Sequence, residues 1–98
     1  MEFRQTRRYT DWFARLRDQR AKARVLARLR RFTLGNPGDV RAVGDGVQEL
    51  RIDYGPGYRV YFMRLGDVVV VLLAGGDKST QQADIEAAKR LAREVRGT

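Results

Sequence analysis

Two runs of alternating residues flank a Gly-Pro-Gly turn in residues 50–62, LRIDYGPGYRVYF, and this pattern restricts the fold most. Successive side chains of a strand point to opposite faces, so alternation predicts a sheet with one buried face. The polar row contains Arg51, Asp53, Arg59 and Tyr61. The sequence therefore predicts a pair of antiparallel strands that presents two arginines on one face.

The rest of the chain divides into further elements by periodicity and by capping residues. In chain order we expect a strand at 2–6, a helix capped by Thr10 or Asp11, a helix from Asp18 to about Leu34, a short strand at 40–43, strands at 47–53, 58–64 and 68–74, and a last helix capped by Ser79. Gly75 and Gly76 are expected to end the last strand. The order is β-α-α-β-β-β-α, with the short strand at 40–43 as an addition.

The second helix carries two stripes at helical spacing. Its apolar stripe, which predicts the buried face, consists of Ala21, Val25, Leu29 and Phe32. Its basic stripe consists of Arg20, Arg24, Arg28 and Arg31. Like charges in a row repel one another, so the basic stripe indicates either a binding surface or long aliphatic stems that cover the edge of the core.

Composition bounds the class of protein. The 98 residues predict one domain, 1–98, and the chain has neither cysteine nor histidine, which removes the commonest metal ligands. The longest apolar run, at 68–74, is too short for a membrane span, and we expect a cytoplasmic protein. Residues 1–41 hold 12 Lys/Arg against 4 Asp/Glu and so carry the whole net charge of +8. This block indicates nucleic acid or an acidic protein segment as partner, or else a solvated helix face.

Three segments carry a resemblance to a known family: the helical pair ending in LGNPGDV, the hairpin VQELRIDYGPGYRVYF, and LLAGGDKSTQQADIEAAKRLA. Together they resemble the RelE/ParE superfamily of toxins from type II toxin–antitoxin modules, and within it the HigB-like, phage-derived addiction module killer proteins. The resemblance covers nearly the whole chain. It implies an α+β fold in which a small, mostly antiparallel sheet packs against two N-terminal helices, with a C-terminal helix.

The same resemblance implies partners and an activity. An antitoxin, expected to be a helix-turn-helix protein, would neutralise the toxin by binding it, and DNA would be contacted only through that antitoxin. The toxin would either cleave mRNA on the ribosome, as RelE and HigB do, or inhibit DNA gyrase, as ParE does. No cofactor, metal or membrane is implied.

Three cations fall on catalytic positions of the resembling nucleases. Arg59 falls on the hairpin arginine used against the scissile phosphate, and Arg51 falls on a lysine with an acid–base or electrostatic role. Lys78 falls on the arginine that stabilises the transition state after the last strand. The catalytic tyrosine of RelE has no counterpart, because Asp84 stands near that place, and the histidines of HigB are absent.

The chemistry can also be weighed on the residues alone. RNA carries its own nucleophile, the 2′-hydroxyl, so an enzyme has to position it, stabilise the pentacovalent phosphorane and assist two proton transfers. Arginine cannot act as a conventional base, which leaves Asp53, Asp77 and Asp84 as candidates for acid–base work. Tyr54 and Tyr61 are candidates for stacking on bases.

Three functions remain open at this point. The chain is a ribosome-dependent endoribonuclease, a toxin against a protein target such as gyrase, or a catalytically inactive RNA-binding domain of the same fold. In the alternative structural interpretation, Arg51, Asp53 and Arg59 merely balance one another's charges. We expect the antitoxin to cover the basic stripe and the face with Arg51 and Arg59, and thereby to block RNA.

Overall fold

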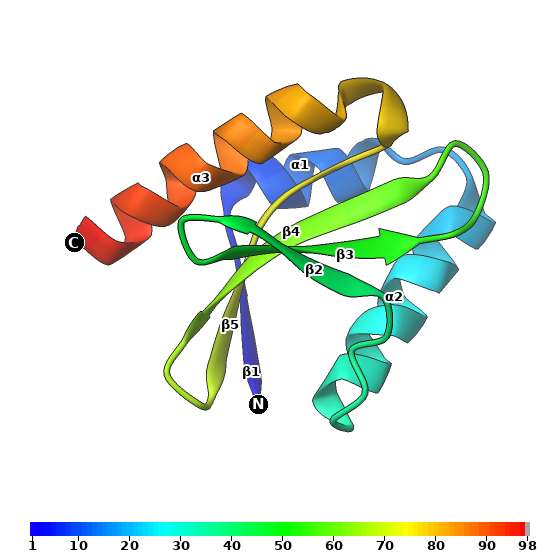
Figure 1. Cartoon of the computed structure of the whole chain (residues 1–98). Coiled ribbons are helices and arrows are strands. Elements are labelled where there is room, and N and C mark those ends of the chain that lie inside the picture. Colours follow the sequence, from blue (N-terminus) through cyan, green and yellow to red (C-terminus); the bar gives the residue numbers. More distant parts are fainter. Residues whose placement is uncertain (98) are drawn as a thin grey trace.

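A computed structural model describes residues 1–97 as an α+β fold with a five-stranded mixed sheet and three α-helices (Figure 1). The elements in chain order are β1 (Glu2–Gln5), α1 (Arg7–Arg15), α2 (Gln19–Thr33), β2 (Val40–Gly44), β3 (Val47–Ile52), β4 (Tyr58–Leu65), β5 (Val69–Gly76), the 3₁₀ turn η1 (Lys78–Thr80) and α3 (Gln81–Gly97). The short additional strand is present as β2. None of the helices within residues 1–97 combines the length and the apolar character needed to span a bilayer.

The strands lie in the order β1-β5-β4-β3-β2. Three neighbouring pairs are antiparallel hairpins, and only β1 runs parallel to its neighbour, β5. The parallel pair needs a crossover, which α1 and α2 supply together with the rest of the sheet. The mostly antiparallel sheet expected from the sequence is thus confirmed.

Both faces of the sheet are covered, each by its own apolar cluster. On one face α1 and α2 pack through Tyr9 and the predicted stripe of α2, of which Val25, Leu29 and Phe32 join the cluster. On the other face α3 packs over a second cluster, as Figure 1 shows. The apolar row of the hairpin faces α1 and α2, so the polar row faces α3.

Tyr61 is therefore placed differently from the expectation. Its side chain is 0% exposed and belongs to the cluster beneath α3. The prediction that Tyr61 stacks on a base is wrong, because α3 covers this end of the polar row. Alternation identified the row correctly, but it does not show which part of a row another element covers.

The caps of two helices also differ from the expectation. Thr6, and not Thr10 or Asp11, caps α1, since its hydroxyl oxygen accepts a hydrogen bond from the Tyr9 amide at 3.1 Å. Asp18 caps α2 as predicted. At the last helix Asp77 caps the turn η1 in place of Ser79, whose amide donates to the Asp77 carboxylate at 2.8 Å.

The last strand is longer than predicted. β5 continues through Gly75 and Gly76, which were expected to end it. Both glycines pair with β4, Gly75 with Val60 and Gly76 with Arg59. The end of β5 therefore lies directly beside the polar end of the hairpin.

Candidate functional site

The three cations proposed as catalytic residues, Arg51, Arg59 and Lys78, line one pocket of about 410 Å³. Arg51 of β3 and Arg59 of β4 are direct partners in the strand register. Like charges placed directly opposite each other destabilise a sheet, and here each arginine lies beside a carboxylate, Arg51 beside Asp39 and Arg59 beside Glu49. Asp39, Asp53 and Tyr58 also line this pocket.

The turn before β4 brings Gly57, which lines the pocket, close to two of the cations. Gly57 has φ +81°, a left-handed conformation that glycine adopts without strain. A Cβ atom at this position would lie 3.2 Å from Arg59 Nη1 and 3.7 Å from Lys78 Cβ. The Lys78 amide donates to the Pro56 carbonyl at 3.4 Å, which ties η1 to the same turn. The Gly-Pro-Gly sequence thus lets η1 approach the hairpin closely.

Arg59 is held in position by the buried carboxylate of Glu49. Its side chain is only 11% exposed, and its Nε lies 3.5 Å from Glu49 Oε2. Its Nη1 donates to the Gly57 carbonyl at 2.8 Å. These two contacts fix the guanidinium at the edge of the pocket.

Glu49 itself is 0% exposed and takes part in four polar contacts. Besides Arg59 they come from Arg41 Nε at 2.8 Å, Tyr61 Oη at 3.0 Å and Gln81 Nε2 at 2.9 Å. Glu49 is not among the residues predicted from the sequence, although it stands two residues before Arg51 and so belongs to the same row of β3. That position in the row was the signal that could have identified it.

The network keeps Glu49 ionised and Tyr61 neutral. Burial acts to raise the pKa of Glu49, but the hydrogen bonds from Arg41, Gln81 and Tyr61 outweigh it and lower the pKa. Burial, followed by the charge of Glu49, raises the pKa of Tyr61. Tyr61 therefore stays a phenol that donates to Glu49, and it supplies no general base.

Arg51 and Lys78 lie at the more open side of the pocket. Arg51 forms a two-pronged ion pair with Asp39, with Nε and Nη2 each 3.2 Å from a carboxylate oxygen. This pair replaces the balance with Asp53 that the sequence suggested. Lys78 is exposed, and within residues 1–97 no carboxylate lies within 4.0 Å of its ammonium group.

The basic stripe of α2 is divided in its roles. Arg28 connects α2 to β3 and to the loop before β2, because its guanidinium donates to the carbonyls of Arg51 at 2.5 Å and Pro37 at 2.9 Å. Arg20 and Arg31 are exposed. Arg24 forms, with Arg28 and Arg31, a hollow of about 320 Å³ that shares its Ile52 and Asp53 lining with the pocket of the three cations.

Tyr54 is half-buried at the other end of this basic surface. The Arg24 guanidinium lies over its ring at 4.6 Å from the centroid. Its hydroxyl donates to Asp18 Oδ2 at 2.8 Å, and its ring stacks beside Tyr58 at 6.4 Å. A base that stacks on the face covered by Arg24 has to displace that side chain.

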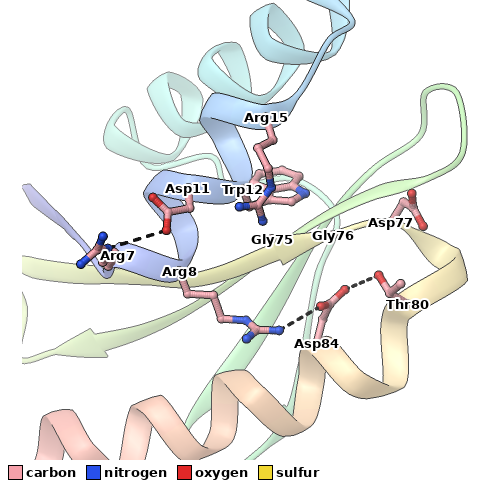
Figure 2. Close-up of a pocket in the computed structure, with 10 residues that line it drawn as sticks. All are labelled: Arg7, Arg8, Asp11, Trp12, Arg15, Gly75, Gly76, Asp77, Thr80 and Asp84. Carbon is pink, nitrogen blue, oxygen red and sulfur yellow. Dashed lines mark hydrogen bonds and ion pairs between the residues drawn. The ribbon is translucent and has the colours of Figure 1, made fainter.

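Two of the three candidate acid–base residues lie outside the pocket of the three cations. Asp77 and Asp84 line a separate hollow of about 620 Å³ between α1 and the start of α3 (Figure 2). Asp84 accepts a hydrogen bond from Thr80 Oγ1 at 2.6 Å, while Asp77 is engaged in capping η1. Asp53 is the candidate that shares a pocket with Arg51, Arg59 and Lys78. Within residues 1–97 there is no group of three acidic side chains placed to hold a metal ion.

Comparison with known proteins identifies the family. Residues 11–95, which include Arg51, Arg59 and Lys78, match the family described as "Phage derived protein Gp49-like (DUF891)". An uncharacterized protein of Haemophilus influenzae is 48% identical over 95 residues, an alignment that covers 97% of this chain and 96% of that relative. No solved structure matches the chain. By its sequence match and its relative, this chain belongs to the Gp49-like family of phage-derived proteins.

Proposed function

We propose that the protein is the toxin of a type II toxin–antitoxin module and that it cleaves mRNA on the ribosome. The observation that carries the proposal is the cross-strand pairing of Arg51 with Arg59, with Lys78 in the same pocket. The RelE/ParE-like character of the fold is part of this proposal. It is supported by the element order and by the resemblance of the hairpin and of the segment that follows it.

The proposed reaction is attack of the RNA 2′-oxygen on the adjacent phosphorus. The bond to the 5′-oxygen breaks, which leaves a 2′,3′-cyclic phosphate on one fragment and a 5′-hydroxyl on the other. Arg59 and Lys78 would stabilise the negative charge that grows on the phosphorane oxygens, and Arg51 would join them if it leaves Asp39. Asp53 is the proposed acceptor of the 2′-hydroxyl proton, because it lines the same pocket, and water supplies the proton that the departing 5′-oxygen takes up.

The proposed partners follow from the charge of this surface. An acidic antitoxin segment would pair with the exposed arginines of α2, Arg20 and Arg31, and cover the pocket beside Arg59, so that neutralisation is occlusion of the RNA site. A helix-turn-helix antitoxin would bring DNA to the complex indirectly. A ribosomal substrate places the toxin in the cytoplasm.

The experiment is induced expression in bacteria of the wild type, of Arg59→Ala and of the charge-matched control Arg90→Ala, an exposed residue of α3. The 5′ ends of mRNA are mapped within minutes of induction. We expect growth arrest and new ends inside translated frames with the wild type and with Arg90→Ala, and neither with Arg59→Ala. Circular dichroism of the purified variants shows whether each one folds.

The second candidate is inhibition of a protein target such as DNA gyrase. The Asp39–Arg51 ion pair favours it, because that pair neutralises one of the three cations on which the proposed phosphate binding depends. Growth arrest with intact mRNA would replace the nuclease proposal with this one. Absence of arrest would leave the third alternative, an inactive RNA-binding domain.

A further inference from the structure

The larger hollow, of about 620 Å³, lies outside the pocket of the three cations, between α1 and the junction of β5 with α3 (Figure 2). Helix α1 contributes an aromatic side chain and several charged ones, and Asp84 extends from the first turn of α3 on the opposite wall. The side chains from α1 are Arg7, Arg8, Asp11, Trp12 and Arg15.

The end of β5 lies between the two walls of this hollow and carries one of its side chains on each face. A Cβ atom at Gly75 would lie 2.1 Å from the Trp12 ring, and one at Gly76 would lie 1.9 Å from Asp84 Oδ2. Neither distance is possible for a real side chain, so the two glycines are what allows the indole and the carboxylate to approach β5. Trp12 and Asp84 therefore pack directly against the backbone of β5.

Trp12 is half-buried and links this hollow to the pocket of the three cations. Its ring meets the Tyr58 ring edge-on, with centroids 6.5 Å apart, and Tyr58 lines the other pocket. The chain also connects the two sites, because Asp77 of the larger hollow directly precedes Lys78. The two sites are thus neighbours across the contact of Trp12 with Tyr58.

The polar groups of the hollow include a carboxylate that can accept a further hydrogen bond and a cation without a carboxylate partner. Asp84 is 7% exposed, and its Oδ1 forms an ion pair with Arg8 Nη2 at 3.7 Å, a separation too long for a direct hydrogen bond. Its Oδ1 can therefore still accept a hydrogen bond. Arg15 is exposed, and no carboxylate within residues 1–97 lies within 4.0 Å of its guanidinium.

We propose that this hollow binds one nucleotide of single-stranded RNA, beside the phosphate that is cleaved. The base rests against the exposed part of the Trp12 indole and donates hydrogen bonds to Asp84, while Arg15 binds a neighbouring phosphate. A carboxylate only accepts, so the site favours guanine, whose adjacent N1–H and N2–H₂ groups both donate, over uracil. The inference rests on the proposed function, since it takes RNA as the substrate.

An acidic protein segment fits this hollow less well. Asp11, Asp77 and Asp84 line it as well as the three arginines, so a chain of carboxylates would meet repulsion on the side of α3. The half-buried indole beside a fixed acceptor suits a flat ring with N–H donors. The antitoxin surface proposed above, on α2 and the hairpin, borders this hollow at the contact of Trp12 with Tyr58 but is lined by other residues.

Trp12 is the single tryptophan of the chain, so its fluorescence reports directly on this hollow. The full-length protein is titrated, without ribosomes, with hexanucleotides that carry 2′-O-methyl groups and therefore cannot be cleaved. One oligonucleotide contains a central guanine, one has inosine at that position, and one is all uracil. We expect quenching by all three, with the guanine oligonucleotide binding about tenfold more tightly than the uracil one and inosine in between.

Two variants test whether the oligonucleotides bind in this hollow. Arg15→Ala is expected to weaken binding of the guanine oligonucleotide about tenfold, whereas the matched control Arg30→Ala, on the exposed side of α2, leaves it unchanged. Asp84→Asn is expected to abolish the preference for guanine. Because Asp84 is buried and its variant can fail to fold, the Arg15 variant, at an exposed position, keeps the proposal testable.

The proposal is overturned if no oligonucleotide quenches Trp12, if guanine and uracil bind equally, or if Arg15→Ala and Arg30→Ala behave alike. Quenching by a poly-glutamate peptide but by no oligonucleotide would make the hollow a protein-docking site instead. mRNA cleavage in cells without quenching overturns this inference alone. Quenching with guanine preference but without cleavage supports the inference and overturns the proposed nuclease.

Discussion

Glu49 is the residue on which the geometry of the cation pocket depends most. It is fully buried and contacts Arg59, Arg41, Tyr61 and Gln81, which come from β4, β2 and α3. Its carboxylate therefore joins three elements and holds the Arg59 guanidinium at the pocket. Removing one partner of a buried ion pair costs more than the pair itself stabilises, because the other charge stays buried.

Glu49→Ala is accordingly expected to lower the free energy of unfolding by about 3–5 kcal/mol. The matched control Tyr61→Phe removes one hydrogen bond to the same carboxylate and should cost about 1 kcal/mol. Urea denaturation of both variants measures the difference. Equal losses in the two variants would show that the carboxylate is not the centre of the network.

The same residue predicts how stability responds to acid. The folded protein lowers the pKa of Glu49 below its ordinary value of 4.5, so the stabilisation is complete above that pH and is lost as the pH falls through the folded pKa. We expect the melting temperature of the wild type to fall more steeply below pH 4.5 than that of Glu49→Gln. Thermal melts from pH 7 to pH 3 test this. Parallel curves would contradict the assignment.

At the scale of single residues the sequence predicted which side chains share a row, and little about their surroundings. Arg51, Asp53 and Arg59 were identified from alternation, and Lys78 from the resemblance, and all four line one pocket. The burial of Tyr61 depends on where α3 crosses the sheet. That placement is set by packing between distant segments, which no local pattern contains.

Among the elements, the end of β5 carries the contacts that hold α1 and α3 in place. Consecutive strand residues face opposite sides, and Gly75 accordingly meets Trp12 of α1 while Gly76 meets Asp84 of α3. The two glycines thus let one helix approach each face of the same strand. β5 continues where a strand break was predicted because both glycines stay paired with β4.

Gly75→Ala is expected to destabilise the fold by about 1–3 kcal/mol, because its Cβ would overlap the indole and force α1 to shift. Gly97→Ala is the control, since nothing lies within 4 Å of a Cβ at that position, and it should change stability by less than about 0.5 kcal/mol. The unfolding midpoint in urea separates the two variants. A Gly75→Ala protein as stable as the control would contradict this packing.

Element boundaries show the same division between local and distant causes. The apolar stripe of α2 and the cap at Asp18 were predictable, because both depend on residues of the helix itself. The start of α1 at Arg7 was not, since its cap Thr6 also donates a hydrogen bond to the Leu73 carbonyl of β5 at 2.6 Å. A long-range bond selected Thr6 over Thr10, which is an equally good capping residue by type.

For the whole molecule, the distribution of charge determines where a polyanion binds. The net charge of +8 resides entirely in residues 1–41, and the exposed residues Arg24 and Arg31 of α2 line a hollow that shares Ile52 and Asp53 with the cation pocket. In the proposed function, a single strand of RNA that enters the pocket of Arg51, Arg59 and Lys78 would therefore continue along α2.

Salt dependence of RNA binding tests this distribution. The logarithm of the RNA association constant decreases linearly with the logarithm of the salt concentration. For single strands the magnitude of this slope decreases by about 0.7 for each phosphate contact that is lost. The double variant Arg20→Ala/Arg31→Ala should therefore flatten the slope for a 20-nucleotide poly-uridine by about 1.4. The control Arg64→Ala/Arg90→Ala removes the same charge from exposed positions of β4 and α3, and should leave the slope unchanged. Equal slopes in both double variants would mean that RNA responds to net charge alone and that α2 forms no defined part of its path.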